Sequence, residues 1–375
     1  MKIYLIRHGE TDWNHINRFQ GRENVPLNAA GILQARNCGK TLQGLSIEAV
    51  YTSPLMRAGR TGAEIGARIG LLPEQVQPME ELIERDLGPF SGQLVKDKKE
   101  YFALAAGDGV PGMEPFKAVL KRMQQALVLM AHTGKQAVAA VSHGAAINVI
   151  LAGLTNNEIG TGKTRLYNGA INVIEGSETE GFHVVHCNLP PDDPKTTQLL
   201  GYDRLEKSLM DIIREQQAKL GFRKESIGLY YPLSTLNHFF RTEEKEPEML
   251  KRLMNLPPYL TDKLGQIMVS AKDGQFCFHI PEQGSQYVHE NKTGDDFIQK
   301  LVNLVGNHCT MQEIRQLFQQ YSAHVEYSTI DNGEFDYMLR FLDRPEDPYY
   351  YCFREEGCHI IYHRFLPEDY EDFQF

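Results

Sequence analysis

Two short polar clusters, each placed directly after an apolar run, carry the residue types needed for phosphate chemistry. Arg7 and His8 follow the run 3–6, and His143 follows the run 137–141. A neutral imidazole is a good nucleophile near neutral pH, because its unperturbed pKa is about 6.5. Arginine supplies a permanently charged planar fork that matches phosphate oxygens. The clusters therefore predict attack on phosphorus by a histidine, with arginine neutralising the charge.

A third apolar run, 49–51, leads to another arginine. The order Ser53-Pro54 is typical of a helix start, with the hydroxyl as cap and proline at the first helical position. This start would put Arg57 in the first turn of the helix. Because the carboxyl ends of parallel strands meet at one edge of an open sheet, the three clusters should converge. We expect a phosphate pocket there.

The elements that must position these residues alternate between short apolar runs and amphipathic segments. Such alternation predicts a three-layer α/β/α sandwich with a mainly parallel sheet. Further along, two runs of residues predict a hairpin around a polar turn. We expect helices at 28–42, 54–69, 116–132 and soon after Gly144, and the hairpin strands at 169–174 and 181–186.

Several further segments occur in an order and spacing that, taken together, is specific although each is weak alone. They are Leu5–Asn14, Arg18–Gly21, Val25–Asn28 with Gly31, Gln34 and Ala35, Thr52–Ala58 with Thr61, Leu82–Glu84 with Gly88, and Ser142–Gly144. With these segments, residues 1–190 resemble the histidine phosphatase superfamily, in its phosphoglycerate mutase-like branch. The resemblance implies the phosphoglycerate mutase-like fold.

The resemblance also implies roles for individual residues. His8 would be the nucleophile that forms a phosphohistidine, and Glu84 would protonate the leaving oxygen and then activate water. No metal or cofactor is implied. The phosphoryl oxygens would be bound by Arg7, Asn14, Arg57 and His143, with Gln20, Gly21 and Gly144 beside the phosphate.

The choice of Glu84 as proton donor also has a physical basis. An alcohol that leaves a phosphate monoester needs a proton, and a carboxyl group is a common donor. Glu80 and Glu81 are competitors, and all three carboxylates could instead lie on an exposed acidic helix end. Glu84 is favoured because Leu82 and Leu87 would anchor its segment.

The chain departs from the family pattern in the region that follows the acid. Ser91 stands where many relatives have a glutamate, and Met113 interrupts a segment that resembles the family's Gly-Glu-Ser. Residues 90–115 are expected to act as a lid and to set specificity, but they name no substrate. These departures concern substrate choice more than phosphoryl chemistry.

Three functions are compatible with the motifs. Hydrolysis of small phosphomonoesters is favoured, because the region between Glu84 and His143 offers no clear arginine pair to clamp a small carboxylate. The lysines at 96–99 are better explained as a solvated face, and Lys121-Arg122 falls on a helix. A cofactor-dependent phosphoglycerate mutase is the second hypothesis, and a non-catalytic phosphate-binding module is the third.

The length of 375 residues predicts two domains. We expect the histidine phosphatase domain at 1–190, a proline-rich acidic linker at 191–200 and an α+β domain at 201–375. Residues 1–195 contain 20 Lys and Arg and 20 Asp and Glu, so the formal charge of −10 lies on the remainder. This acidity argues against nucleic acid or an anionic membrane as a partner.

The C-terminal half resembles no characterised family. It predicts a helix at 202–220, a hairpin around Lys272-Asp273-Gly274, a capping box at Thr310–Glu313, and paired strands at 349–353 and 358–365. It could shape the active-site entrance, bind an effector or form a homodimer, and the sequence does not choose among these roles.

His359 and His363, with Cys352 and Cys358 nearby, raise the question of a metal site. No Cys-x-x-Cys or comparable ligand spacing is present, so packing or surface roles are expected and no metal is predicted. Six scattered cysteines favour free thiols over a disulfide framework. Together with a start in the first strand, which leaves no room for a signal peptide, they predict a cytoplasmic protein.

Overall fold

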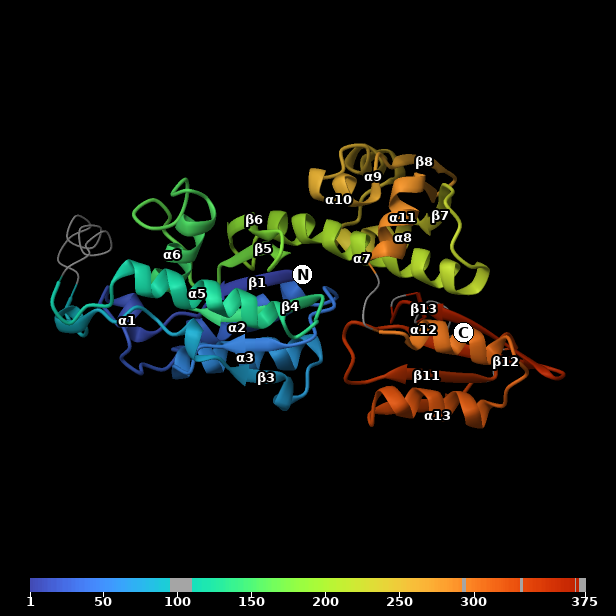
Figure 1. Cartoon of the computed structure of the whole chain (residues 1–375), viewed down its shortest axis with the longest axis horizontal. Helices are drawn as coiled ribbons and strands as arrows, with labels where there is room; N and C mark the ends of the chain where they lie inside the picture. Colours follow the sequence, from blue (N-terminus) through green and yellow to red (C-terminus); the bar gives the residue numbers. More distant parts are fainter. Residues whose placement is uncertain (95–109, 292–294, 331–332, 368, 371–375) are drawn as a thin grey trace. The chain divides into compact units, whose positions relative to one another are not determined.

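The computed structural model describes residues 1–94, 110–291, 295–330, 333–367 and 369–370. The chain forms two compact units, Met1–Thr196 and Thr197–Phe375. Figure 1 shows the mixed sheet of the first unit and the two smaller sheets of the second. Within the described residues, no helix is both long and apolar enough to cross a membrane.

The first unit contains one six-stranded sheet and the helices around it. Its strands are β1 (Lys2–Arg7), β2 (Val50–Thr52), β3 (Val76–Pro78), β4 (Ala137–Ser142), β5 (Ile171–Ser177) and β6 (Gly181–Leu189). Its helices are α1 (Asp12–His15), α2 (Ala29–Leu42), α3 (Met56–Ile69), α5 (Phe116–Ala131) and α6 (Gly144–Leu154), with 3₁₀ turns η1 (Pro73–Gln75), η2 (Glu80–Leu82) and η3 (Gly88–Phe90).

The strand order β3-β2-β4-β1-β5-β6 places β1 and β4 side by side in the middle of the sheet. β3, β2, β4 and β1 are parallel to one another. β5 runs antiparallel to β1 and to β6, and β5 and β6 form the predicted hairpin. The predicted three-layer sandwich with a mainly parallel sheet is confirmed (Figure 1).

Burial explains why these apolar runs become central strands. Ile3 and Leu5 of β1 pack in one core cluster with α5 and α6. The helix layer that contains α3 covers the opposite face of the sheet. There, Gly62 of α3 lies so close to Val50 and Thr52 of β2 that a Cβ would be 2.3 Å from the threonine methyl group. A strand covered on both faces needs apolar side chains on both, which is why the runs do not alternate.

The start of α3 differs from the prediction. The Ser53 side chain does not cap the helix, which begins at Met56 with Leu55 as its N-cap residue. The Ser53 hydroxyl lies 2.7 Å from His143 Nε2, and its oxygen also accepts the backbone N–H of Leu55 over 3.3 Å. The N–H of Met56, the first helical residue, donates instead to Asn24 Oδ1 over 2.7 Å. Arg57 still falls in the first turn, as expected.

The second unit is α+β, and its described residues form two antiparallel sheets, with a large hydrophobic core cluster beside each. The three-stranded sheet β7-β9-β8 and its helices comprise α7 (Pro194–Leu220), β7 (Ile227–Pro232), α8 (Leu233–Phe240), α9 (Glu246–Leu253), α10 (Pro258–Leu264), β8 (Met268–Lys272), β9 (Gln275–Ile280) and α11 (Glu282–Glu290). The four-stranded sheet and its helices comprise α12 (Phe297–Val305), α13 (Met311–Tyr321), β10 (Val325–Thr329), β11 (Tyr337–Phe341), β12 (Tyr350–Glu356) and β13 (His359–Phe365).

Local signals in this half give the elements that were expected. β8 and β9 form the hairpin around Asp273, β12 pairs with β13, and Thr310 and Glu313 make the capping box of α13. The expected linker at 191–200 is mostly helical, because α7 already begins at Pro194. Proline is tolerated in a first helical turn, and the Asp193 carboxylate accepts the backbone N–H of Lys195 there.

Candidate active site

The two central strands end together and deliver the two histidines to one place. Arg7 at the end of β1 is in register with Ser142 at the end of β4, and the next residues are His8 and His143. The backbone N–H of His8 donates to the Ser142 carbonyl over 3.0 Å. The imidazole ring centroids of His8 and His143 lie 5.1 Å apart. The predicted convergence of these two residues is therefore present.

His8 is buried and its two ring nitrogens have different partners. Nδ1 lies 2.6 Å from the Gly9 carbonyl oxygen, which can only accept a proton, so Nδ1 carries the hydrogen. Nε2 then presents a lone pair, and Arg57 Nε donates to it over 3.2 Å. Burial, and then the charges of Arg57 and Arg7, hold the pKa of His8 well below its ordinary value. His8 is therefore neutral at pH 7.

Arg57 is held in place by backbone carbonyls. It is 1% exposed. Its Nη1 donates to the Glu23 carbonyl over 2.6 Å and its Nη2 to the Gly21 carbonyl over 2.8 Å. Burial lowers the pKa of Arg57 to about 10, which still leaves the guanidinium charged at neutral pH. The site thus contains a fixed buried cation next to a neutral nucleophile.

His143 is fully buried where β4 ends, as the N-cap residue of α6. Its Nε2 bonds to the Ser53 hydroxyl, and no described residue pairs with its buried Nδ1. Burial, and then the charge of Arg57 and the neighbouring His8, lower the pKa of His143 well below its ordinary value. A buried polar atom without a partner in a cationic pocket points to a ligand that supplies the missing contact.

A contact between two glycines fixes the loop that carries the nucleophile. A Cβ on Gly9 would lie 2.2 Å from the Gly31 carbonyl oxygen, and a Cβ on Gly31 would lie 2.0 Å from the Glu10 carbonyl oxygen. Gly31 is in the first turn of α2, whose N-cap Asn28 donates through its side chain to Glu10. Glycine is thus required by close approach of two backbones, and the His8 loop is docked on α2.

Glu84 is positioned by the N-terminus of α6, the helix that follows His143. Its Oε1 accepts from the backbone N–H groups of Arg85 (2.8 Å) and Ala146 (2.9 Å), and Oε2 accepts from Ala145 (3.2 Å). The side chain is 9% exposed, so it faces the interior and not an acidic surface. A carboxylate has about four lone-pair sites, so Oε2 retains one for a substrate or a water.

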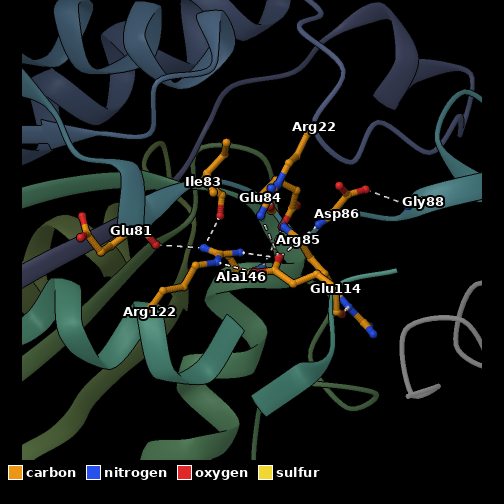
Figure 2. Close-up of polar contacts among 10 residues, drawn as sticks. All are labelled: Arg22, Glu81, Ile83, Glu84, Arg85, Asp86, Gly88, Glu114, Arg122 and Ala146. Carbon is orange, nitrogen blue, oxygen red and sulfur yellow. Dashed lines mark hydrogen bonds and ion pairs between the residues drawn. The ribbon is translucent and has the colours of Figure 1, made fainter. Parts of the chain in front are cut away.

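Arg122 of α5 fixes the segment that precedes Glu84, as Figure 2 shows. Its Nη1 donates to the carbonyls of Glu81 (2.9 Å) and Ile83 (2.5 Å). Its Nε and Nη2 form a bidentate pair with Glu114 at 2.9 and 3.1 Å. The arginine is therefore occupied on three of its nitrogens by groups of the protein itself.

Glu114 gathers the segment that follows the acid (Figure 2). Arg22 donates to the Glu114 carboxylate over 3.2 Å and to the Glu84 carbonyl over 3.1 Å. Arg85 donates to the Glu114 carbonyl over 2.8 Å. The backbone N–H of Asp86 also donates to the Glu114 carboxylate. Burial opposes ionisation, but the hydrogen bonds and charge of the arginine on α5 outweigh it and lower the pKa of Glu114. Glu114 thus connects the segment at Glu84 to the loop that carries Arg22.

Asn14 lies on α1 and is joined to His8 through one residue. Its Oδ1 accepts from the Thr11 N–H and hydroxyl, and also from Asn168 Nδ2 over 3.3 Å. Asn168 Nδ2 in turn donates to the His8 carbonyl over 3.2 Å. Because Oδ1 takes the donors of the protein, the Asn14 amide N–H₂ is turned toward other acceptors, which suits the predicted phosphate contact.

Gln20 and Gly21 take different places. Gln20 is buried, and its Oε1 has no hydrogen-bond partner among the described residues. Gly21, with φ +51°, gives its carbonyl to Arg57, so its position serves the arginine. Contact of either residue with phosphate stays a prediction.

Arg7 and Gly144 lie next to one another at the strand ends. Arg7 Nη1 donates to the Leu166 carbonyl over 2.6 Å, and a Cβ on Gly144 would come 3.5 Å from Arg7 Nε. Gly144 is the first residue of α6, so a backbone N–H and a guanidinium adjoin there. Phosphate binding by this pair also stays a prediction.

The sequence did not single out Ser53, Asn168 or Arg22 as contributors to the site. For Glu114, the resemblance of residues 110–115 to a family segment was a usable signal. Most of the expected lid, including the lysines at 96–99, lies outside the described residues. Within the part of the chain described, no third Cys, His or carboxylate oxygen is near enough to the two active-site histidines to complete a metal site with them.

Both halves of the chain match known protein families. Residues 3–190 match the histidine phosphatase superfamily (branch 1), and residues 202–374 match "Domain of unknown function, E. rectale Gene description (DUF3877)". The uncharacterized phosphatase PhoE of Bacillus subtilis (strain 168) is 34% identical over 179 residues, covering 47% of this chain and 89% of that protein. The probable phosphoglycerate mutase GpmB of Serratia proteamaculans (strain 568) is 31% identical over 159 residues, covering 40% and 74%.

A solved structure of a mycobacterial glucosyl-3-phosphoglycerate phosphatase is also similar. It is 23% identical, with a TM-score of 0.44, over 50% of this chain and 98% of that chain.

Proposed function

The chain belongs to the histidine phosphatase superfamily, and from that premise we propose that it hydrolyses small phosphomonoesters through a phosphohistidine on His8. The observation that carries the proposal is the state of His8. It is neutral, its tautomer leaves the lone pair on Nε2, and that lone pair faces the buried cation Arg57. A phosphoryl group that binds Arg57 comes to lie next to the attacking nitrogen.

In the first step, Arg57 Nε–H shifts its hydrogen bond from His8 Nε2 to a phosphoryl oxygen, and the freed Nε2 lone pair attacks phosphorus as the bond to the leaving alcohol oxygen breaks. Arg57, Arg7, Asn14 and His143 neutralise or hydrogen-bond the three remaining oxygens. Glu84 enters this step protonated on Oε2 and delivers that proton to the leaving oxygen, which departs as the neutral alcohol and leaves Glu84 as the carboxylate. Little covalent chemistry is asked of the protein, so the rate depends on in-line placement and on charge stabilisation.

In the second step, a water molecule takes the place of the alcohol. The Glu84 carboxylate removes a proton from this water, and its oxygen attacks phosphorus as the bond to Nε2 breaks. The products are inorganic phosphate and His8 in its starting tautomer. The backbone N–H groups that hold Glu84 at the start of α6 keep the carboxylate in one place for both proton transfers.

The hydrogen bonds of Arg122 support hydrolysis over mutase activity. A mutase must hold the carboxylate of phosphoglycerate while the phosphate changes position, and a bidentate arginine is the natural clamp. Arg122 is instead bonded to Glu114 and to two backbone carbonyls, and Arg22 bonds Glu114 and the Glu84 carbonyl. Arg122 therefore presents no uncommitted fork to a substrate, and of the two guanidinium groups only Nη1 of Arg22 is left without a partner among the described residues.

The test is hydrolysis of an aryl phosphate by the full chain in the presence of a chelator. We expect turnover that His8→Ala abolishes. His15→Ala is the matched control, because His15 is an exposed histidine on α1 with a side chain 76% exposed. A phosphoenzyme should be detected by intact mass after an alkaline quench and should be absent in His8→Ala. Full activity of His8→Ala would refute the proposal.

The other two functions give different outcomes in the same set of assays. A mutase would interconvert phosphoglycerates faster than it releases phosphate and would need a bisphosphorylated primer. A binding module would retain phosphate affinity, measured by calorimetry, without any turnover. We expect release of phosphate to exceed isomerisation.

A further inference from the structure

A cluster of metal-ligating side chains lies in the second unit, in residues that the proposed reaction does not use. His308, Cys358 and His359 bring one donor atom each to within 4.8 Å of one another. All three side chains are exposed. Cys358 and His359 are neighbours in the sequence, whereas His308 comes from a different connection. Sequence spacing therefore could not reveal the group.

Two connections that share one hydrophobic core hold the three residues together. Cys358 is in the turn between β12 and β13, and His359 begins β13. His308 lies between α12 and α13. The core joins both connections, since it contains residues of all four elements, namely Phe297, Leu301, Ile314, Phe318, Tyr351, Phe353 and Ile360. The relative positions of the donors are thus set by packed elements and not by loose ends of the chain.

His308 is turned toward the hairpin by its backbone and by a hydrogen bond. Its φ is +49°, a left-handed conformation that is uncommon for a residue other than glycine. Its Nδ1 lies 3.2 Å from the Cys358 carbonyl oxygen. Because a carbonyl only accepts, Nδ1 carries the proton and Nε2 has the free lone pair. A ligating histidine commonly makes this bond with its other nitrogen.

The remaining two donors have no competing partner. Among the described residues, no hydrogen bond or ion pair is made by Cys358 Sγ or by the His359 ring. The two imidazole rings lie with centroids 4.6 Å apart, at 37° to each other. Donor atoms around a tetrahedral zinc ion are about 3.5 Å apart. Rotation about the side-chain torsions of these exposed residues can shorten the distances between the donor atoms to that value.

We propose that His308, Cys358 and His359 form a binding site for Zn²⁺. Two imidazoles and one thiolate are nitrogen and sulfur donors, which suit zinc and do not suit Mg²⁺ or Ca²⁺. Three protein ligands leave a fourth position for water or another donor. The bound ion would join the α12–α13 connection to the β12–β13 turn. The proposal does not depend on the activity of the first unit, because the proposed reaction uses none of these three residues.

The test is titration of the untagged full chain with Zn²⁺ by calorimetry. We expect one bound ion, and a loss of affinity of at least about tenfold in each of His308→Asn, Cys358→Ser and His359→Ala. Asn suits the left-handed backbone at 308, so that variant keeps the fold. His363→Ala, on the same strand, and Cys277→Ser, which removes a thiol near another histidine, are the controls and should bind as the unchanged chain does.

Co²⁺ gives a second measurement that reports the ligands directly. We expect a thiolate-to-cobalt charge-transfer band that Cys358→Ser removes and His363→Ala leaves in place. The site is overturned if the band is absent, or if the variants at 308, 358 and 359 bind Zn²⁺ as tightly as the unchanged chain. It is equally overturned if Cys277→Ser abolishes binding.

Discussion

Burial of two neutral imidazoles should make the first unit sensitive to acid. The pKa of both His8 and His143 is lowered well below the ordinary value, with burial the largest cause and nearby positive charge the next. In the unfolded chain each imidazole is free to take up a proton below pH of about 6.5. The folded state does not bind these protons until the pH reaches the lower folded pKa. The free energy of unfolding must therefore fall as the pH drops below about 6.5, and it continues to fall until the folded pKa is reached.

The size of the effect follows from the proton uptake. Each pH unit below the unfolded pKa costs about 1.4 kcal/mol per group while the folded group stays neutral. Between pH 7.5 and pH 5.0 the free energy of unfolding should therefore fall by up to about 2 kcal/mol for each imidazole. His143→Gln replaces one imidazole with a neutral amide of similar reach. This variant should lose up to about 2 kcal/mol less than the unchanged chain over the same interval.

The assay is urea unfolding in a buffer free of phosphate and sulfate, followed by tryptophan fluorescence. Trp13 is the single tryptophan of the chain and lies on α1, so the signal reports the first unit alone. Ser53→Ala is the control, because it removes the hydroxyl bonded to His143 but leaves both titrating groups. It should lower stability by about 1 kcal/mol at every pH. Equal pH dependence in His143→Gln and in the unchanged chain would refute the reasoning.

Three other predictions concern the acid, the buried cation and the glycine contact. Glu84→Gln should lower kcat about 10²- to 10⁴-fold with alkyl phosphates and less with aryl phosphates, whose leaving groups need less protonation; equal losses would contradict the acid role. Arg57→Lys should lower kcat/KM about 10²- to 10³-fold, because an ammonium group has three donors, whereas Arg57 bonds two carbonyls and His8 Nε2 before it meets a phosphate; near-normal kinetics would argue against it. In urea unfolding, Gly31→Ala should cost about 3 kcal/mol through its clash with the Glu10 carbonyl, whereas Gly59→Ala, with open space in the interior of α3, should stabilise by up to about 1 kcal/mol. Similar effects of the two alanines would show that the glycine contact is not tight.

Much of the first unit could be predicted because its signals are local. Runs such as 3–6 and 137–141 are apolar on both faces, which only a covered central strand explains. Asn28 caps α2 as its residue type suggests. The start of α3 was predicted wrongly because a second side chain competes with Ser53: the first helical N–H, that of Met56, donates to Asn24, 32 positions away in the sequence. Local propensity cannot register a competitor so distant in sequence.

The parts of the site that escaped prediction depend on long-range contacts. Glu114 and Arg122 matter because they hold the Glu84 segment, and nothing at either position states its partner. The lysines and arginines in this region could be counted, but whether they face a ligand or a carboxylate of the protein is decided by the fold. The same holds for His308, which becomes a neighbour of Cys358 only when helices and hairpin pack together.

The carbonyl cage around Arg57 has a consequence for turnover. Because its guanidinium is anchored by the Gly21 and Glu23 oxygens, its orientation is set before any oxyanion arrives. An arginine held in this way binds the tetrahedral anion itself, and the organic part of an ester adds little to the binding free energy at this residue. Released inorganic phosphate has the same charge and shape as the group that was cleaved. Under the proposed activity, accumulating product should therefore compete with fresh substrate and slow the reaction.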